Sequence, residues 1–297
     1  MHNSRPMIWL MVVASTFFWG SNFNAGQAIA DDVQALTAAA ERFGIAFIGF
    51  LLLRLLQGKA ESRLRLSDML VLVPLGIIGV FGFNYAFFTA LHTTSALNAA
   101  LIMALSPMVS LLLSAWLLPV TIRGYQYVGI VLAFTGVSLV ITGGRFALLT
   151  IAIGDAWMLF AMFVWSLYSV GSKRFAGHIP PIQFARWTVC IGAIALIAAA
   201  LLVEEPLTTI PALPLSVHLI LIYMSVFGAV LAYIFWLRGV FYLGPDRSAI
   251  AFNLVPVFTL LVSLGMGEVP LLLQFVGLGL VLIGVFISSG WRPGRPV

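Results

Sequence analysis

Charged side chains are scarce in this chain. Asp, Glu, Lys and Arg make up 8% of its 297 residues, whereas 62% of the residues are hydrophobic. A soluble domain carries roughly 25% charged residues, so this chain cannot cover itself with a polar surface. The composition excludes a water-soluble fold and indicates an integral membrane protein whose solvent is the lipid bilayer. The net charge of +5 does not indicate a nucleic-acid partner, because the basic residues lie between apolar runs.

Cysteine and catalytic motifs are also nearly absent. The single Cys190 lies in an apolar run, where it can form neither an internal disulfide nor a Cys/His metal site. The chain has no His-Glu-x-x-His pattern, no paired catalytic carboxylates and no Gly-x-Ser-x-Gly elbow. We therefore expect a protein that is not an enzyme and that binds no metal and no cofactor.

The middle of every apolar run lacks Asp, Glu and Lys. The acids Glu41, Asp68 and Asp155 lie near the ends of runs. A mid-membrane carboxylate is the usual group for proton coupling and for binding cationic drugs, because a buried charge is expensive and persists only where it has a task. Its absence argues against an antiporter of small cationic drugs. We also expect Arg42 and Arg186, near the starts of two runs, to extend toward the lipid headgroups, and a gating or substrate role is the alternative.

The apolar runs are long enough for ten membrane-spanning helices. A bilayer core of about 30 Å needs around 20 apolar residues in helical conformation, and lipid offers no hydrogen-bond partner to an open backbone. The predicted spans are 7–27, 33–56, 68–91, 96–118, 124–143, 153–172, 181–203, 215–238, 247–267 and 270–290. The fold class is thus an all-α integral membrane protein.

Lys and Arg predict the orientation of these spans. With the N-terminus in the cytoplasm, all but two of the 15 Lys and Arg residues fall on the cytoplasmic side, and the exceptions are Arg42 and Arg145. Ten spans return the C-terminus to the cytoplasm, where Arg292 and Arg295 agree with the rule. We expect both termini inside, the 57–66 and 173–180 loops inside, and the 28–34 and 204–214 loops outside.

The chain contains an internal repeat. Residues 126–129 recur as 274–277, Ser106-Pro107 recurs as Val255-Pro256, and Phe18-Trp19 recurs as Val164-Trp165, each about half the chain length later. Five spans in each half place the second half in the membrane upside down. Inverted repeats of this kind build secondary transporters around a site at the midplane. We predict two five-helix repeats, residues 1–146 and 147–297, around a central cavity.

Neutral polar and aromatic side chains lie away from the span ends and predict the lining of that cavity. An Asn in hydrocarbon is costly unless it has a partner, so it faces another helix or a wet cavity. Trp and Tyr combine an apolar face with a hydrogen-bonding tip. The predicted wall residues are Trp19, Asn22, Asn84, Tyr85, Trp165, Tyr168, Tyr233, Trp236 and Asn253. Pro107 and Pro256 should kink the fourth and ninth spans and free backbone carbonyls beside this wall.

Several motifs resemble a known family. The segments Thr93-Thr94-Ser95-Ala96 and Ser106-Pro107, and Gly267-Glu268 before a Gly-punctuated last span, resemble the EamA-type members of the drug/metabolite transporter superfamily. The resemblance covers both halves and includes bacterial inner-membrane exporters of the YddG type. It implies a cavity lined by the first, third, fourth, sixth, eighth and ninth spans, with the fifth and tenth spans peripheral.

Together these observations predict a monomeric secondary transporter of the bacterial inner membrane. It would export small amino acids or similar zwitterionic or neutral metabolites by alternating access, down their gradient and without a full counter-charge in the site. An exporter of drugs, sugars or nucleosides remains open, and a channel is a weaker alternative, since polar residues cluster near midspan rather than running from face to face.

Overall fold

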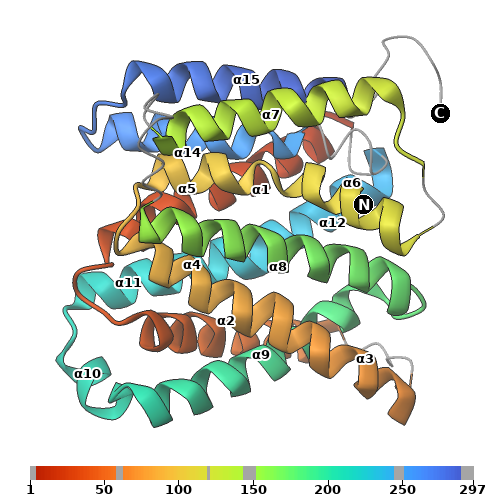
Figure 1. The fold of residues 1–297 in the computed structure, drawn as a ribbon. Coiled ribbons are helices and arrows are strands. Elements are labelled where there is room, and N and C mark those ends of the chain that lie inside the picture. The colour runs from red at the N-terminus through yellow and green to blue at the C-terminus, as the bar shows by residue number, and fades with distance from the viewer. Residues whose placement is uncertain (1–4, 58–62, 119–120, 143–151, 244–250, 289–297) are drawn as a thin grey trace.

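The computed structural model describes the chain except for residues 1–4, 58–62, 119–120, 143–151, 244–250 and 289–297. The described part is a bundle of roughly parallel and antiparallel helices (Figure 1). In the first half they are α1 (Arg5–Ala28), α2 (Ala35–Gln57), α3 (Leu66–Gly76), η1 (Ile77–Gly82), α4 (Phe83–Leu91), α5 (Ala96–Met103), α6 (Ser106–Leu117) and α7 (Gly124–Thr142). In the second half they are α8 (Ile153–Phe175), α9 (Pro181–Val203), α10 (Pro206–Ala212), α11 (Leu215–Tyr223), η3 (Met224–Leu231), α12 (Ala232–Leu243), α14 (Leu254–Gly265) and α15 (Leu272–Ser288).

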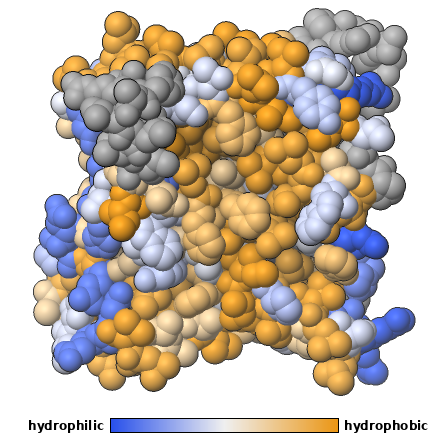
Figure 2. Space-filling view, in the orientation of Figure 1, coloured by the Kyte–Doolittle hydropathy of each residue, from blue (hydrophilic) through white to orange (hydrophobic). Residues whose placement is uncertain are grey.

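Nine of the ten predicted spans coincide with helical stretches of the described chain, and the remaining one, 247–267, is described only from residue 251 onward. Seven helical stretches of the described chain are long and apolar enough to cross a membrane by length and composition, and α14 and α15 are shorter apolar helices. Figure 2 shows a broad hydrophobic surface between two ends that carry the hydrophilic residues. The short helix α10, within the 204–214 loop, was not expected from the sequence. Five of the basic residues that predict the orientation of the spans lie outside the described residues: Lys59, Arg145, Arg247, Arg292 and Arg295.

Contacts between helices repeat with the two halves exchanged. Helix α1 packs against α12 and α14, and α8, its counterpart in the second half, packs against α4, α5 and α6. Likewise α2 packs against η3, and α9 packs against η1. Each half thus completes the other, which is the arrangement expected of two inverted repeats around a shared centre.

The last helix of each half lies at one edge of the bundle. Helices α7 and α15 run side by side along the top of Figure 1, whereas α2 and α9 lie at the opposite edge. Gly284 and Gly129 lie at a close approach of the two backbones, because a Cβ at Gly284 would lie 2.5 Å from the carbonyl oxygen of Gly129. Small residues let two membrane helices pack backbone to backbone.

The third and eighth spans change helix type at corresponding places. Each begins as an α-helix, passes through the π-helical segment η1 or η3, and continues as α4 or α12. A π-helical turn widens the helix and often marks a functional region. The fourth and ninth spans are interrupted too: α5 ends at Met103 and α6 begins at Ser106, while Asn253 forms a turn before α14. Both interruptions lie directly before the prolines, which cannot donate an N–H to the preceding turn.

Candidate functional site

Two neighbouring hollows lie among these interrupted helices. The first, here called the vestibule, has a volume of about 660 Å³ and reaches two exposed residues, Lys173 in the last turn of α8 and Gly177 just after that helix. The second, the central pocket, has a volume of about 180 Å³ and lies deeper in the bundle, lined by residues of both halves. Five aromatic residues line both hollows, which are therefore neighbours: Trp19, Trp165, Tyr168, Tyr233 and Phe252.

The predicted wall residues divide between the two hollows. Four of them, Trp19, Trp165, Tyr168 and Tyr233, line both; Asn22, Asn84 and Asn253 line the central pocket, and Trp236 lines the vestibule. Pro107 lines the vestibule and Pro256 the central pocket.

Tyr85 differs from the other predicted wall residues. It lines neither hollow in the described part of the chain, and its ring contacts Trp157 at 5.6 Å between centroids. Its sequence counterpart Tyr233 follows the eight-residue segment η3, whereas Tyr85 follows the six-residue segment η1. The two helices therefore leave their π-helical turns with different faces toward the centre.

Hydrogen bonds fix the aromatic residues at the junction of the hollows. The indole Nε1 of Trp19 donates to the carbonyl oxygen of Gly228 at 3.0 Å. The hydroxyl of Tyr233 donates to the carbonyl oxygen of Pro181 at 3.3 Å. These bonds tie α1 and α12 to neighbouring segments, and they satisfy the polar tips of large apolar side chains. The rings of Trp19 and Trp236 lie 5.2 Å apart.

Glycines in the π-helical segments make room for two wall residues. A Cβ at Gly228 of η3 would lie 2.7 Å from Cγ of Asn22, and a Cβ at Gly79 of η1 would lie 2.8 Å from Cβ of Tyr168. Asn22 and Tyr168 occupy corresponding places in α1 and α8. Each half therefore inserts a side chain against a glycine of the other half, directly beside the central pocket.

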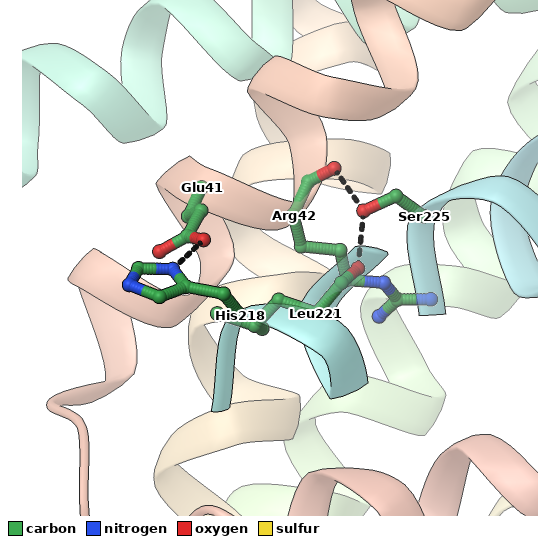
Figure 3. Close-up of polar contacts among 5 residues, drawn as sticks. All are labelled: Glu41, Arg42, His218, Leu221 and Ser225. Carbon is green, nitrogen blue, oxygen red and sulfur yellow. Dashed lines mark hydrogen bonds and ion pairs between the residues drawn. The ribbon is translucent and has the colours of Figure 1, made fainter. Parts of the chain in front are cut away.

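Arg42 corrects two expectations. Its side chain does not extend toward the headgroups: the residue is 6% exposed and lines the central pocket. Its Nη1 donates to Oδ1 of Asn84 at 3.2 Å. In Figure 3 the guanidinium extends away from the neighbouring Glu41, which bonds His218 instead. The pocket thus contains a full positive charge, contrary to the expectation of a site with only neutral polar groups.

The sequence carried a signal for the burial of Arg42. Ala38, Ala39 and Ala46 lie one turn before it and one turn after it, and all three are at most 1% exposed. Residues three and four apart share a helix face, so a face of alanines around an arginine indicates packing against protein rather than lipid.

The lining also departs from the pattern that the resemblance implied. The second span contributes Arg42 and Phe50, and the seventh contributes Val189, to the central pocket. Gln126 and Ser288, from the expected peripheral spans α7 and α15, reach the vestibule and bond each other, with Nε2 of Gln126 donating to the Ser288 carbonyl at 3.2 Å. Helices α7 and α15, which were expected to be peripheral, therefore contribute side chains to the vestibule.

The end of the bundle opposite the vestibule is held together by hydrogen bonds between the halves. Glu204, after α9, accepts bonds from the backbone N–H groups of Leu36 and Thr37 at 3.0 and 2.7 Å. It caps the free N–H groups at the start of α2, where helix geometry leaves them without partners. Thr94 donates a short hydrogen bond to the buried Asp155, which joins α8 to the turn before α5.

The loops gather at two ends in the pattern that the predicted topology requires. His178, from the 173–180 loop, bonds Asp68 at the start of α3 at 2.9 Å, so this loop lies beside the segment that follows α2. Glu204 brings the 204–214 loop beside the start of α2 at the other end. No group of three His, Cys, Asp or Glu residues that could hold a metal ion occurs among the residues that the structure describes.

Comparisons with known proteins agree with this architecture. The model of the EamA-like transporter family matches the chain twice, at residues 6–142 and 152–290. The chain is 34% identical to the uncharacterized transporter YyaM of Bacillus subtilis (strain 168) over 95% of its own length and 93% of that protein. It is 25% identical to the uncharacterized inner membrane transporter YedA of Escherichia coli (strain K12), over 94% of this chain and 90% of that one.

A solved crystal structure shares the fold. It has a TM-score of 0.69 and 22% sequence identity, and the match covers 96% of this chain and 97% of that one. The two family matches together span nearly all of the described helices. The chain therefore belongs to the EamA-like transporter family.

Proposed function

We propose that this protein exports small amino acids, or similar small metabolites, from the cytoplasm across a bacterial inner membrane. The observation that carries the proposal is the arrangement of the site: a vestibule of about 660 Å³ and a central pocket between the two halves lie side by side and share five aromatic lining residues. The volume of the vestibule falls in the range of roughly 300–1,000 Å³ that is typical of small-molecule sites, and the central pocket of about 180 Å³ is smaller.

The aromatic lining supports a cargo with an apolar part. Trp19, Trp165 and Phe252 offer ring faces to both hollows, and Asn22 and Asn253 add hydrogen-bonding groups in the central pocket. An apolar side chain leaves water on entering such a site, which contributes roughly 25 cal/mol per Å² of buried apolar surface. The few polar groups then select the orientation of the cargo.

The asymmetry between the two ends supports alternating access. The vestibule reaches the end that contains the 173–180 loop, and the opposite end is bonded through Glu204, Thr94 and Asp155. With both termini in the cytoplasm, this arrangement is a carrier open to the cytoplasm and closed to the outside. Exchange of the two halves' conformations would reverse it. We further propose that the carrier works as a monomer, performs no chemistry on its cargo, and runs down the cargo gradient.

Counterflow in proteoliposomes tests this function. Liposomes with the purified protein are loaded with an unlabelled amino acid, and uptake of trace labelled amino acid is followed, with sugars and nucleosides as parallel cargoes and with and without a pH gradient. A carrier accumulates label transiently against its gradient, because each conformational cycle exchanges one cargo for another, whereas a channel does not. Accumulation of label with amino acids supports the proposal. Counterflow only with sugars or nucleosides would contradict the amino-acid assignment, and simple equilibration would contradict a carrier.

A further inference from the structure

Arg42 is the one buried cation of the central pocket in the described part of the chain, and its positive charge has no protein counter-charge there. It lies about 10 Å along α2 from the helix start at Ala35, at 1.5 Å per residue. The residue is 6% exposed and lines the pocket together with Asn22 and Asn84. The adjacent acid, Glu41, is held 2.6 Å from Nδ1 of His218, on the side away from the guanidinium (Figure 3).

The contacts of the Arg42 guanidinium in the described structure include no negatively charged group and leave one of its N–H donors without an acceptor. Asn84 accepts one hydrogen bond from Nη1, and Nε has no hydrogen-bond partner in the described structure. The guanidinium carbon lies 5.3 Å from the ring centroid of Phe43 and 5.8 Å from that of Phe87. Ring faces attract and orient a cation, but they do not neutralise it. A guanidinium offers five N–H donors, so the bond to Asn84 does not use all of them.

A charge in this position is expensive to keep. Taking an ion out of water is unfavourable even when a partner is present, and an ionisable residue inside a membrane protein is by default a functional site. If Arg42 served only to position Asn84, a neutral side chain would serve without that penalty. Asn84 is already fixed from its other side, since its Nδ2 donates to the carbonyl oxygen of Val80 at 2.8 Å.

We propose that Arg42 binds the carboxylate of the cargo, and that the transported solutes are small carboxylic acids with an apolar tail, of which amino acids are one class. This inference rests on the proposed transport function and names the group that the site recognises. The planar guanidinium matches a carboxylate with two parallel hydrogen bonds. One carboxylate neutralises one guanidinium, whereas a phosphate dianion would bring a surplus negative charge into a pocket with no second cation among its lining residues.

A second unpaired polar atom fits the amino group of such a cargo. Oδ1 of Asn22 is buried without a hydrogen-bond partner among the described residues, and Asn22 lines the same pocket as Arg42. It is an acceptor, so it suits an N–H donor on the ligand. The aromatic residues between pocket and vestibule then contact the apolar tail. The pocket of about 180 Å³ is too small for a drug-sized molecule and suits the polar end of a small solute.

Matched acid and amide pairs test the carboxylate site. Binding to the purified full-length protein in nanodiscs is followed by tryptophan fluorescence, since Trp19 and Trp165 line both hollows. The probes are leucine and leucinamide, and 4-methylpentanoate and its amide, which lack the amino group. In the wild-type protein each acid should bind at least about 30-fold more tightly than its amide, the factor that corresponds to about 2 kcal/mol for a buried charge pair.

Arg42→Gln should remove this preference, so that acid and amide bind within about threefold of each other, and Arg42→Lys should give an intermediate ratio because the charge remains without the planar fork. Arg186→Gln is the matched control: Arg186 takes the corresponding place in the second half and lines neither hollow. Its acid-to-amide ratio should equal that of the wild type. If Arg42→Gln fails to fold, two measurements still test the proposal. The acid-to-amide affinity ratio of Arg42→Lys should be lower than that of the wild type, and the acids should raise the melting temperature of the wild type more than their amides do.

Several results would overturn the inference. A purely structural Arg42 would weaken acids and amides equally and leave their ratio unchanged. Inorganic phosphate and 4-methylpentanoate are compared as competitors of bound leucine. Equal displacement of leucine by the two would contradict a site that selects carboxylates. The two proposals also fail separately. Suppose that leucine shows counterflow but Arg42→Gln keeps the wild-type acid-to-amide ratio: the transport function then stands and the carboxylate site is refuted. Suppose instead that 4-methylpentanoate binds in an Arg42-dependent way but no amino acid shows counterflow: the carboxylate site then stands and the amino-acid cargo is refuted.

Discussion

Gly228→Ala should crowd the central pocket and destabilise the protein through its contact with Asn22. A Cβ at position 228 would lie 2.7 Å from Cγ of Asn22 and 2.5 Å from its Oδ1. Because carbon atoms pack best at about 3.5–4.0 Å, the Asn22 side chain would have to move by at least about 0.8 Å. Asn22 is 4% exposed and lies against the pocket, so the only space for that movement is the site itself.

The size of the effect follows from two opposing terms. Overpacking of a buried contact costs about 1–3 kcal/mol, and replacement of a helical glycine by alanine returns up to about 1 kcal/mol. Gly44→Ala supplies the second term alone, since no atom lies within 4 Å of a Cβ at that position. Gly228→Ala should therefore be about 1–3 kcal/mol less stable than Gly44→Ala, or roughly 2–12 °C lower in melting temperature.

A double-mutant cycle isolates the contact. The melting temperatures of Gly228→Ala, Asn22→Ala and the double variant are measured in one detergent, together with leucine binding. Asn22→Ala removes the three atoms that a Cβ at Gly228 would meet, so the second substitution should cost nothing in that background. Equal destabilisation of both backgrounds by Gly228→Ala would refute the reasoning, because the strain would then arise from the π-helical backbone and not from Asn22.

Three further substitutions have definite expected outcomes. Glu204→Gln removes the charge that caps α2, so the end opposite the vestibule should open about tenfold more often if the loss is near 1.4 kcal/mol. In an Ala96→Cys background, the introduced thiol should then react faster with a membrane-impermeant reagent. An unchanged rate would contradict a gating role for Glu204. Gly284→Leu should separate α7 from α15 and lower the melting temperature, whereas Gly279→Leu, where nothing lies within 4 Å, should not. Tyr85→Ala should leave leucine affinity within about twofold of the wild type, because that side chain lines neither hollow.

The spans could be predicted from the sequence because each one is a continuous apolar run that ends at glycine, proline or charge. The run predicted as 181–203 and the helix Pro181–Val203 are identical. Such boundaries follow from the local chain and the thickness of the bilayer, so no tertiary information is needed.

The site was harder to predict because it depends on rotation about helix axes. The motif around Tyr85 repeats around Tyr233, yet only Tyr233 faces the hollows, since the length of the preceding π-helical segment differs. The depth of Arg42 also depends on its neighbours in space, Phe43 and Phe87, and on the alanine face of α2. The aromatic-polar pattern that suggested Tyr85 and the position near a span start that suggested the orientation of Arg42 record neither rotation nor neighbours in space.

The cap on α2 has a consequence for the synthesis of the protein. Thr37 and the Glu204 that binds its N–H are separated by 167 residues. At about 5–20 residues per second, the ribosome adds Glu204 roughly 8–33 s after Thr37. During that interval the start of α2 is in the membrane without its acceptor. An insertase or chaperone that shields polar groups of half-made membrane proteins should therefore contact α2 until α9 has emerged.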